Sequence, residues 1–366
     1  MKKSKHVPLL SLVFSCLVFG SEAHSATQDH VLVGAIRWDG WTKDSKWGNN
    51  LKPAQWNYRL PFYAKDSEGA FEVRSDSQEV MDKEIAYASD AGLDYWAFDC
   101  GADTFKDGAE KVGLPLYLSS KNRNRINFCI LWLGTTKDLW PETVRHFIEL
   151  FKDPNYQKVL GGRPLFYEYY VEELAQKFGS VKDAKDAIEY LKTESEKAGL
   201  KPPYMVAQVW NAQDGAKDVE SLGFDAISAY SMSVDVSTLE QKEYPYSRLA
   251  KINHDFWDAC RGTGKDVVPI VNAGWDVRPR WWDKELMKAY TGEDRPWYTQ
   301  ATPMEVANNL KDAIEWTKDY PAAAKARAVI IYAWNETDEG GWIHPTLSEG
   351  TARLDAIRAS ISSGLH

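Results

Sequence analysis

Eight short apolar runs recur along the chain, and this repetition constrains its fold more than any other feature. Strands of a parallel sheet are buried on both faces and have nearly continuous apolar sequences, so we expect each run to form such a strand. Helical patterns fill most of the gaps, and strands that alternate with helices predict right-handed βαβ units. Eight units that close on themselves form an α/β fold, the (β/α)8 TIM barrel, which suits a chain of 366 residues. The runs are Val31–Trp38, Leu93–Cys100, Ile126–Leu133, Pro164–Tyr170, Tyr204–Trp210, Phe224–Tyr230, Val267–Ala273 and Ala326–Trp334.

Three of the helical stretches carry cap residues. Ser77 is expected to cap a helix that presents Met81, Ile85 and Ala88 on one face. A second helix is predicted between Ser180 and Gly199. The sequence Thr302-Pro303-Met304-Glu305 is a capping box with proline at the first helical position, so a third helix begins there.

A single domain over residues 27–366 is predicted, because no linker, repeat or charge block divides that part of the chain. Residues 39–76 and 276–301 are long, aromatic-rich segments, and in a barrel they are the loops after strands 1 and 7, above the active-site face. An open doubly wound sheet is the alternative fold. It is less favoured, because no glycine-rich phosphate turn follows the first apolar run.

Residues 1–26 resemble a secretory signal peptide. Lys2, Lys3 and Lys5 precede the apolar run 7–20, and small residues follow it. The run is too short for a comfortable transmembrane helix, which needs about 20 residues. The chain is therefore expected to be exported to the periplasm or secreted, with lipid modification of Cys16 as the less favoured alternative.

Three cysteines remain after removal of this segment: Cys100, Cys129 and Cys260. An odd number in an exported protein excludes a complete disulfide framework. Cys100 and Cys129 lie in predicted strands, so we expect buried free thiols there.

The charge balance is acidic, with 44 Lys and Arg against 53 Asp and Glu. A nucleic-acid or anionic-membrane partner would need a basic face, so neither is predicted. Asp99 and Asp103 form one short acidic turn, which is too little to predict a metal site. No cofactor motif is present in the sequence. The sequence leaves the oligomeric state open.

Polar and aromatic side chains follow nearly every predicted strand, at the end where TIM barrels hold their reacting groups. Indole rings pack on the apolar C–H faces of pyranoses, while carboxylates and amides bind hydroxyl groups, so together they predict a carbohydrate site. For each aromatic ring alone, packing in the core is the competing interpretation. The residues expected to bind substrate are Trp38, Asp39, Trp41, Asp99, Glu168, Tyr170, Gln208, Trp210, Tyr230, Asn272, Trp275, Asp276, Asn335 and His344.

Glu336 and Glu339 lie three positions apart, directly after the eighth predicted strand. Glycoside hydrolysis needs two carboxyl groups beside the scissile bond, one protonated and one ionised, and this pair is predicted to supply them. The two glycines that follow allow a tight turn. A solvated acidic turn is one alternative. A catalytic pair of Glu168 and Asp276, after strands four and seven, is the other.

The segment Ala333–Pro345, AWNETDEGGWIHP, resembles the WNEW-x-EG signature that closes glycoside hydrolase family 99-like (WbsX-type) domains. The opening segment Val33–Trp41 also resembles the first strand of those domains. The resemblance implies a (β/α)8 barrel related to families 99 and 71. The characterised members of family 99 are retaining endo-α-mannosidases, so it also implies that chemistry.

By this resemblance, the two catalytic carboxylates fall on Glu336 and Glu339. Glu336 is implied to be the base that acts on the 2-hydroxyl of the substrate to form a 1,2-anhydro sugar. Glu339 is implied to be the general acid and then the base that activates water. The chain departs from the signature at Thr337, in place of Trp, and at Asp338, where His or Gly is usual. Asp338 lies beside Glu339, and its like charge is expected to raise a carboxyl pKa there, which suits an acid.

The leading functional hypothesis is an exported glycoside hydrolase that acts on a polysaccharide or glycan without a cofactor. One alternative is a carbohydrate-binding protein on a barrel scaffold, which would have no need for two carboxyl groups three positions apart. Another is a glycosyltransferase-type role, suggested by the name that some relatives carry. Nucleotide-sugar donors are cytosolic, so the predicted export signal argues against that role.

Overall fold

The computed structural model describes residues 30–43, 45–67, 70–101, 104, 113–134, 137–169, 171–233, 241–281 and 296–363. The chain divides into two compact units, residues 1–30 and 31–366. The predicted signal peptide with Cys16, as well as Asp103 and Tyr170, lies outside the described residues. The second unit contains the barrel.

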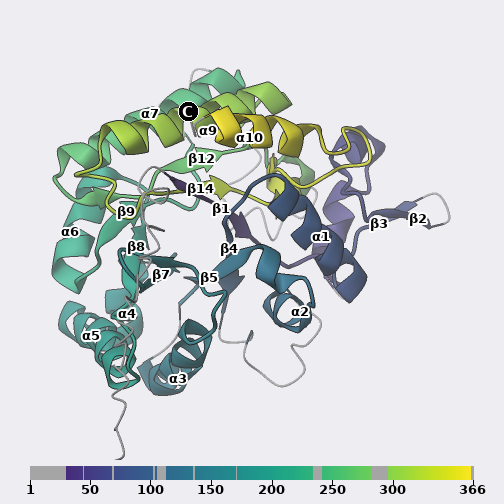
Figure 1. Cartoon of the computed structure of the whole chain (residues 1–366). Helices are drawn as coiled ribbons and strands as arrows, with labels where there is room; N and C mark the ends of the chain where they lie inside the picture. Colours follow the sequence, from purple (N-terminus) through teal and green to yellow (C-terminus); the bar gives the residue numbers. More distant parts are fainter. Residues whose placement is uncertain are drawn as a thin grey trace, which may run out of the picture. The chain divides into compact units, whose positions relative to one another are not determined.

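Eight parallel strand positions form the centre of this unit (Figure 1). Neighbours along the sheet follow the order β11-β9-β8-β7-β5-β4-β1-β14-β12. All eight positions coincide with the apolar runs, so the predicted (β/α)8 fold is confirmed. The strands are β1 (Leu32–Arg37), β4 (Tyr95–Cys100), β5 (Asn127–Trp132), β7 (Arg163–Glu168), β8 (Tyr204–Gln208), β9 (Ala226–Ser228), β11 (Asp266–Val267) continued by β12 (Ile270–Asn272), and β14 (Ala328–Tyr332).

The seventh strand closes the sheet, and it does so in two pieces. β11 pairs with β9, and β12 pairs with β14. Between them, the Val268 N–H donates to the Ile227 carbonyl at 2.9 Å, and the Pro269 carbonyl accepts from the Ile330 N–H at 3.0 Å. Proline has no N–H, so the ladder is interrupted there, while the chain still joins the two edges of the sheet.

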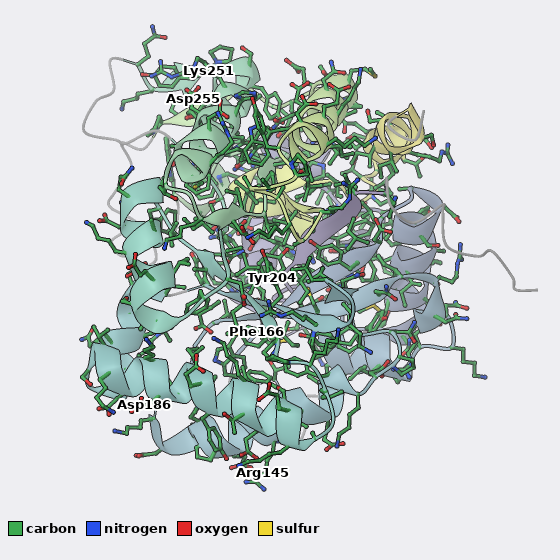
Figure 2. All side chains as sticks on the ribbon, turned by 60° about the vertical axis from the view of Figure 1, so that its left-hand side comes forward. Arg145, Phe166, Asp186, Tyr204, Lys251 and Asp255 are labelled. Carbon is green, nitrogen blue, oxygen red and sulfur yellow. The ribbon has the colours of Figure 1, made fainter. Side chains whose placement is uncertain are left out.

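Side chains fill the inside of the barrel. The Tyr95 hydroxyl lies 2.8 Å from the Tyr167 hydroxyl and 3.2 Å from the Val329 carbonyl oxygen. A Cβ at Gly34 would overlap the Tyr95 ring, so this position in β1 needs glycine. Figure 2 shows Phe166 and Tyr204 inside the molecule, on β7 and β8. The barrel is thus a packed core whose function must lie at one end.

Helices surround the sheet (Figure 1). The predicted caps are confirmed: the Ser77 hydroxyl accepts from the Val80 N–H at 3.3 Å, and Ser180 caps α5. Thr302 and Glu305 form the complete capping box. The helices are α1 (Gln78–Asp90), α2 (Gly113–Ser119), α3 (Trp140–Phe151), α4 (Leu174–Phe178), α5 (Val181–Lys197), α6 (Ala212–Leu222), α7 (Tyr246–Gly262), α9 (Pro303–Asp319) and α10 (Ala352–Ser363).

The long loop after β1 has its own small core. The buried cluster consists mainly of Trp41, Leu51, Trp56 and Leu60. The elements of this loop are the 3-10 helices η1 (Lys46–Leu51) and η2 (Ala54–Arg59) and the antiparallel hairpin of β2 (Lys65–Ser67) and β3 (Ala70–Glu72). Because the loop packs internally, it can hold side chains at fixed positions above the barrel.

The loop after β12 contains η8 (Arg278–Arg280) and β13 (Trp297–Tyr298), which pairs with β10 (Glu243–Tyr244). The other short elements are η4 (Arg123–Arg125), η5 (Lys137–Leu139), η6 (Val171–Glu173) and β6 (Lys158–Val159), which pairs with β7.

The three cysteines after the signal segment, Cys100, Cys129 and Cys260, are buried free thiols, as expected for the first two. Across the described ranges, no helix has both the length and the apolar character needed to cross a membrane.

Candidate active site

A pocket of about 350 Å³ opens at the C-terminal ends of the barrel strands. Every one of the eight strand positions contributes a residue to it, and the loops after β1 and β12 add Trp47 and Arg280. The strand-end residues that line the pocket are Trp38, Asp99, Leu133, Tyr169, Trp210, Tyr230, Ser231, Ser233, Trp275, Glu336 and Glu339. The structure thus brings seven of the predicted site residues to one cavity.

The turn after β14 presents both glutamates to the pocket. β15 (Asn335–Glu336) and β16 (Gly341–Trp342) pair as a short antiparallel ladder around η9 (Thr337–Glu339). Gly340 ends this 3-10 turn with φ at 85°, and a Cβ there would lie 2.6 Å from the Asp276 nitrogen. Only glycine tolerates both the positive φ and the close approach.

Glu336 lies in a poor environment for a negative charge. Its side chain is 3% exposed, and its Oε1 is 2.6 Å from the Tyr230 hydroxyl. Its Oε2 is 3.6 Å from Arg280 Nη2 and has no hydrogen-bond partner among the described residues. Burial raises the pKa of Glu336 well above its usual range, and the charges of Glu339 and Asp338 add to this.

Glu339 meets two hydrogen-bond donors. Its Oε1 pairs with Arg280 Nη1, and its Oε2 accepts from the Tyr332 hydroxyl. Cations and donors favour the ionised form of a carboxyl group. The two glutamates of one turn therefore lie in opposite electrostatic environments.

Asp338 points away from the pocket wall and holds Arg280 instead. The Arg280 Nε and Nη2 atoms donate to the two Asp338 oxygens at 2.7 and 3.0 Å, and Asn50 Nδ2 donates to the same carboxylate at 2.6 Å. Burial lowers the pKa of Arg280, but Asp338 and Glu339 raise it well above its usual range. Arg280 is therefore a fixed cation between the acidic residues.

Aromatic rings form much of the remaining wall. Trp38 packs edge-on against Trp47 with ring centroids 5.4 Å apart, and Tyr169 packs against Tyr230 at 4.6 Å. Trp210 is 56% exposed at the rim, where its Nε1 donates to Glu172 at 3.2 Å. Such rings offer apolar faces of the kind on which sugars stack.

Eight of the described residues that were predicted to bind substrate do not line the pocket: Asp39, Trp41, Glu168, Gln208, Asn272, Asp276, Asn335 and His344. The Trp41 ring is fully buried, and its Nε1 donates to the Asn335 carbonyl at 3.0 Å. The Asn335 side chain in turn binds the main chain of Trp38. Trp41 and Asn335 therefore support the wall instead of lining it.

Four other members of this group also have partners within the fold. Asp39 pairs with the buried Arg37 at 2.8 Å. Asn272 accepts from the Met232 N–H at 3.1 Å, and the Gln208 amide is 3.4 Å from the Ala229 carbonyl. His344 lies 3.0 Å from the Thr337 hydroxyl, and burial lowers its pKa to about 3, so it is neutral.

The alternative pair, Glu168 and Asp276, also lies outside the pocket lining. Asp276 is paired with both Arg59 and Arg278, which joins the loops after β1 and β12. Glu168 is buried, its pKa is raised well above the usual range by burial, and its Oε1 has no partner among the described residues. Asp276 is therefore engaged by two guanidinium groups, whereas Glu168 is a buried carboxyl group next to the pocket residue Tyr169.

The predicted site did not include the lining residues Trp47, Leu133, Tyr169, Ser231, Ser233 and Arg280. Tyr169 is near the end of the predicted fourth strand, beside Glu168, and that position is the signal that identifies it. Trp47 and Arg280 lie inside long loops, where strand periodicity carries no information about direction. Among the described residues, no group of three or more His, Cys, Asp or Glu is placed to hold a metal ion.

The fold and the pocket define a (β/α)8-barrel protein with two buried carboxyl groups of contrasting environment at the mouth of its barrel. The chain belongs to the family described as glycosyltransferase WbsX, whose model matches residues 134–357. The matched region includes Glu336 and Glu339, and it confirms the family that the C-terminal signature predicts.

Solved structures with the same fold include a GH99 endo-alpha-mannosidase from Bacteroides thetaiotaomicron in complex with Bis-Tris-propane. It has a TM-score of 0.55 and 15% identity, over 92% of this chain and 97% of that one. A second structure of the mannosidase from that organism has a TM-score of 0.53 and 14% sequence identity, over 92% of this chain and 97% of that one. The structure of XacCel5A has a TM-score of 0.51 and 11% sequence identity, over 91% of this chain and 99% of that one. At these identities the likeness establishes the barrel fold. No match was found among curated proteins.

Proposed function

We propose that the protein is a glycoside hydrolase that cleaves a polysaccharide or glycan at the pocket above the barrel. The observation that carries this proposal is the contrast between Glu336 and Glu339. One carboxyl group has a raised pKa and few donors, while the other pairs with a cation and a tyrosine hydroxyl. Hydrolysis of a glycosidic bond needs one carboxyl of each kind.

The proposed reaction uses the two groups together. One carboxyl gives a proton to the glycosidic oxygen as the bond from C1 breaks, and the other takes a proton from the attacking hydroxyl. The family resemblance implies that this hydroxyl is first the substrate's own 2-hydroxyl, which gives a 1,2-anhydro sugar and overall retention. It also implies an α-mannoside-like substrate, and the endo-alpha-mannosidases of the same fold support that choice for the first assays.

Substrate binding is proposed to rely on the aromatic wall. Trp38, Trp47, Trp210 and Trp275 surround the carboxyl groups, and indole faces suit pyranose rings. We also propose that the chain acts after export, with residues 1–26 removed. A sugar polymer outside the cytoplasm would then be its substrate.

A glycosyl-transfer role is the second candidate, because the family is described as a glycosyltransferase. The predicted export signal favours hydrolysis, since nucleotide-sugar donors are cytosolic. Product analysis with an oligosaccharide acceptor separates the two: a transferase lengthens the acceptor, and a hydrolase releases reducing ends.

The test compares the purified mature protein with Glu336→Gln and Glu339→Gln on polysaccharides and aryl glycosides, α-mannosides first. We expect wild type to release reducing ends and each variant to lose at least about 100-fold in rate. Glu142→Gln, at the exposed start of α3, is the matched control and should keep full activity. Full activity in both site variants would redirect the search to Glu168 and Asp276. A glycan that raises the Tm without being cleaved would instead support the carbohydrate-binding alternative.

A further inference from the structure

The Tyr230 hydroxyl lies between two carboxyl groups, those of Glu336 and Asp99. The Tyr230 hydroxyl lies 2.6 Å from Glu336 Oε1 and 2.8 Å from Asp99 Oδ2. A hydroxyl has one proton to donate, so it can serve only one of these two oxygens. The second hydrogen bond needs a proton on a carboxyl group. At least one of Glu336 and Asp99 is therefore neutral when both contacts are made.

Glu339 shows the opposite arrangement. Arg280 Nη1 and the Tyr332 hydroxyl both donate to it, one to each oxygen. Both neighbours already carry their own protons, so no proton on Glu339 is needed to complete its hydrogen bonds. The hydrogen bonds thus require a proton on Glu336 or Asp99 and none on Glu339.

The charges around Arg280 then assign a proton to Glu336 as well as to Asp99. One guanidinium, Arg280, faces Glu336, Asp338 and Glu339, and it contacts the last two most closely. Asp99 brings a fourth carboxyl group, with an Oδ1 that lacks a partner among the described residues. Four negative charges, three of them buried, against one positive charge are costly. Protons on Glu336 and Asp99 leave one excess negative charge, shared by Asp338 and Glu339 around the cation.

We infer that Arg280, held in place by Asp338, is a positioning residue that keeps Glu339 ionised, so that Glu336 donates the proton and Glu339 acts as the base. This inference rests on the proposed function. It reverses the two roles that the family resemblance implies. The residues responsible are Asp338, where the chain departs from the family signature, and Arg280, which Asp338 holds.

The proton balance of the two steps follows. In the first, Glu336 gives its proton to the glycosidic oxygen as the bond to C1 breaks and the alcohol leaves. Glu339 takes the proton of the 2-hydroxyl, whose oxygen forms the new bond to C1. In the second, the Glu336 carboxylate takes a proton from water as the water oxygen bonds to C1, and Glu339 returns its proton to O2 as the C1–O2 bond breaks.

The decisive experiment varies the leaving group. Glu336→Gln and Glu339→Gln are assayed on 2,4-dinitrophenyl and phenyl glycosides of a sugar that wild type hydrolyses, α-mannosides first. A dinitrophenolate leaves without a proton, so we expect Glu336→Gln to lose at least about 100-fold on the phenyl glycoside and less than about 10-fold on the dinitrophenyl one. Glu339→Gln should lose at least about 100-fold on both. The reverse pattern would overturn the inference.

A measurement without substrate keeps this inference separate from the proposed function. Infrared difference spectra at neutral pH should show the loss of a protonated-carboxyl band in Glu336→Gln and of an ionised-carboxylate band in Glu339→Gln. A protonated band lost in Glu339→Gln instead would refute the assignment, whether or not any glycoside is cleaved. Wild type that cleaves nothing, with the infrared result as expected, would count against the proposed function alone.

The role of Arg280 has its own readout. The groups around the pair are Tyr230, Asp99, Tyr332, Asp338 and Arg280, and Arg280 supplies the cation. Without the Arg280 cation, Glu339 binds a proton more readily. Arg280→Met should therefore move the acidic limb of kcat/KM to higher pH, and Arg280→Lys should move it less. Arg125→Met, an exposed residue before β5 at the opposite end of the barrel, should leave the profile unchanged. An unmoved acidic limb in a folded Arg280→Met would contradict the assignment.

Discussion

Asp338→Asn removes one buried charge from the site with almost no change in side-chain size. Asp338 is fully buried, and its two oxygens accept from Arg280 at 2.7 and 3.0 Å and from Asn50 at 2.6 Å. Asparagine offers one carbonyl oxygen, and its NH2 group would face these donors. At least one of the three hydrogen bonds is therefore lost, and Arg280 is left with less than its full counter-charge.

The expected cost can be worked out from this geometry. Breaking a buried ion pair by removal of one partner costs about 3–5 kcal/mol, and we expect about 3 kcal/mol because Arg280 keeps Glu339 as a partner. Over residues 31–366, an unfolding entropy of about 2 cal/mol/K per residue amounts to about 0.7 kcal/mol/K. The Tm should therefore fall by about 4 °C.

The same variant should shift the pH profile. Asp338 helps to raise the pKa of Glu336, so its neutralisation lowers that pKa. The proton donor must be protonated to act, and the alkaline limb of kcat/KM should move to lower pH. Thermal unfolding and a kcat/KM profile measure the two effects. Asp355→Asn, an exposed partner of Arg358, is the control and should change the Tm by less than about 1 °C. An unchanged Tm, or an alkaline limb at higher pH, would refute the reasoning.

Three further predictions concern the turn, the rim and the buried histidine. Gly340→Ala should destabilise the protein by more than about 1 kcal/mol and lower kcat, because φ at this position is 85° and the new Cβ would meet Asp276. Gly262→Ala, in a helix with open space around it, is the control for both measurements. Trp210→Ala should leave the Tm unchanged and raise KM by about 10-fold, or about 1.4 kcal/mol, since the ring is 56% exposed at the rim; a lower Tm with an unchanged KM would contradict a binding role. His344 has a pKa lowered to about 3, against about 6.5 when unfolded, so it contributes stability above pH 6.5 that is lost as the pH falls toward 3. Denaturant unfolding measures the free energy of unfolding at pH 7 and at pH 5. Its decrease between the two pH values should be about 2 kcal/mol smaller in His344→Gln than in wild type, and equal decreases would contradict the role of His344.

The barrel was predictable from sequence because each of its strands is buried on both faces. An apolar run such as Ile126–Leu133 has no solvent side, so its pattern is continuous and its limits are sharp. The seventh strand was predicted as one element, and the structure divides it at Pro269. Pairing of its two halves with different neighbours depends on closure of the sheet, which no local pattern encodes.

The site was predictable in part, for a related reason. Asp99 and Tyr230, at the ends of predicted strands, line the pocket. Gln208 and Asn272 end β8 and β12 but have partners within the fold, so a place at a strand end is not sufficient. Trp41 and His344 lie several residues beyond a strand, where the direction of a side chain depends on how the loop packs. The partner of Glu339 was out of reach of sequence reasoning, because Arg280 is 59 residues away and is placed by Asp338 and Asn50 from two other loops.

The two departures from the family signature have different structural consequences. Thr337 is fully buried and faces His344 and the Asn335 carbonyl, on the side of the turn away from the pocket. Position 337 therefore does not shape the wall that a sugar would meet. The replacement of the signature Trp by Thr337 changes instead the packing behind the turn. Asp338 holds Arg280 against Glu336 and Glu339 and so acts on their charge. Under the proposed function, contacts with the substrate come from the rings on other elements, such as Trp47 and Trp210. It follows that sugar preference in this chain should respond to changes in the loops after β1 and β8, and proton transfer to changes at positions 338 and 280.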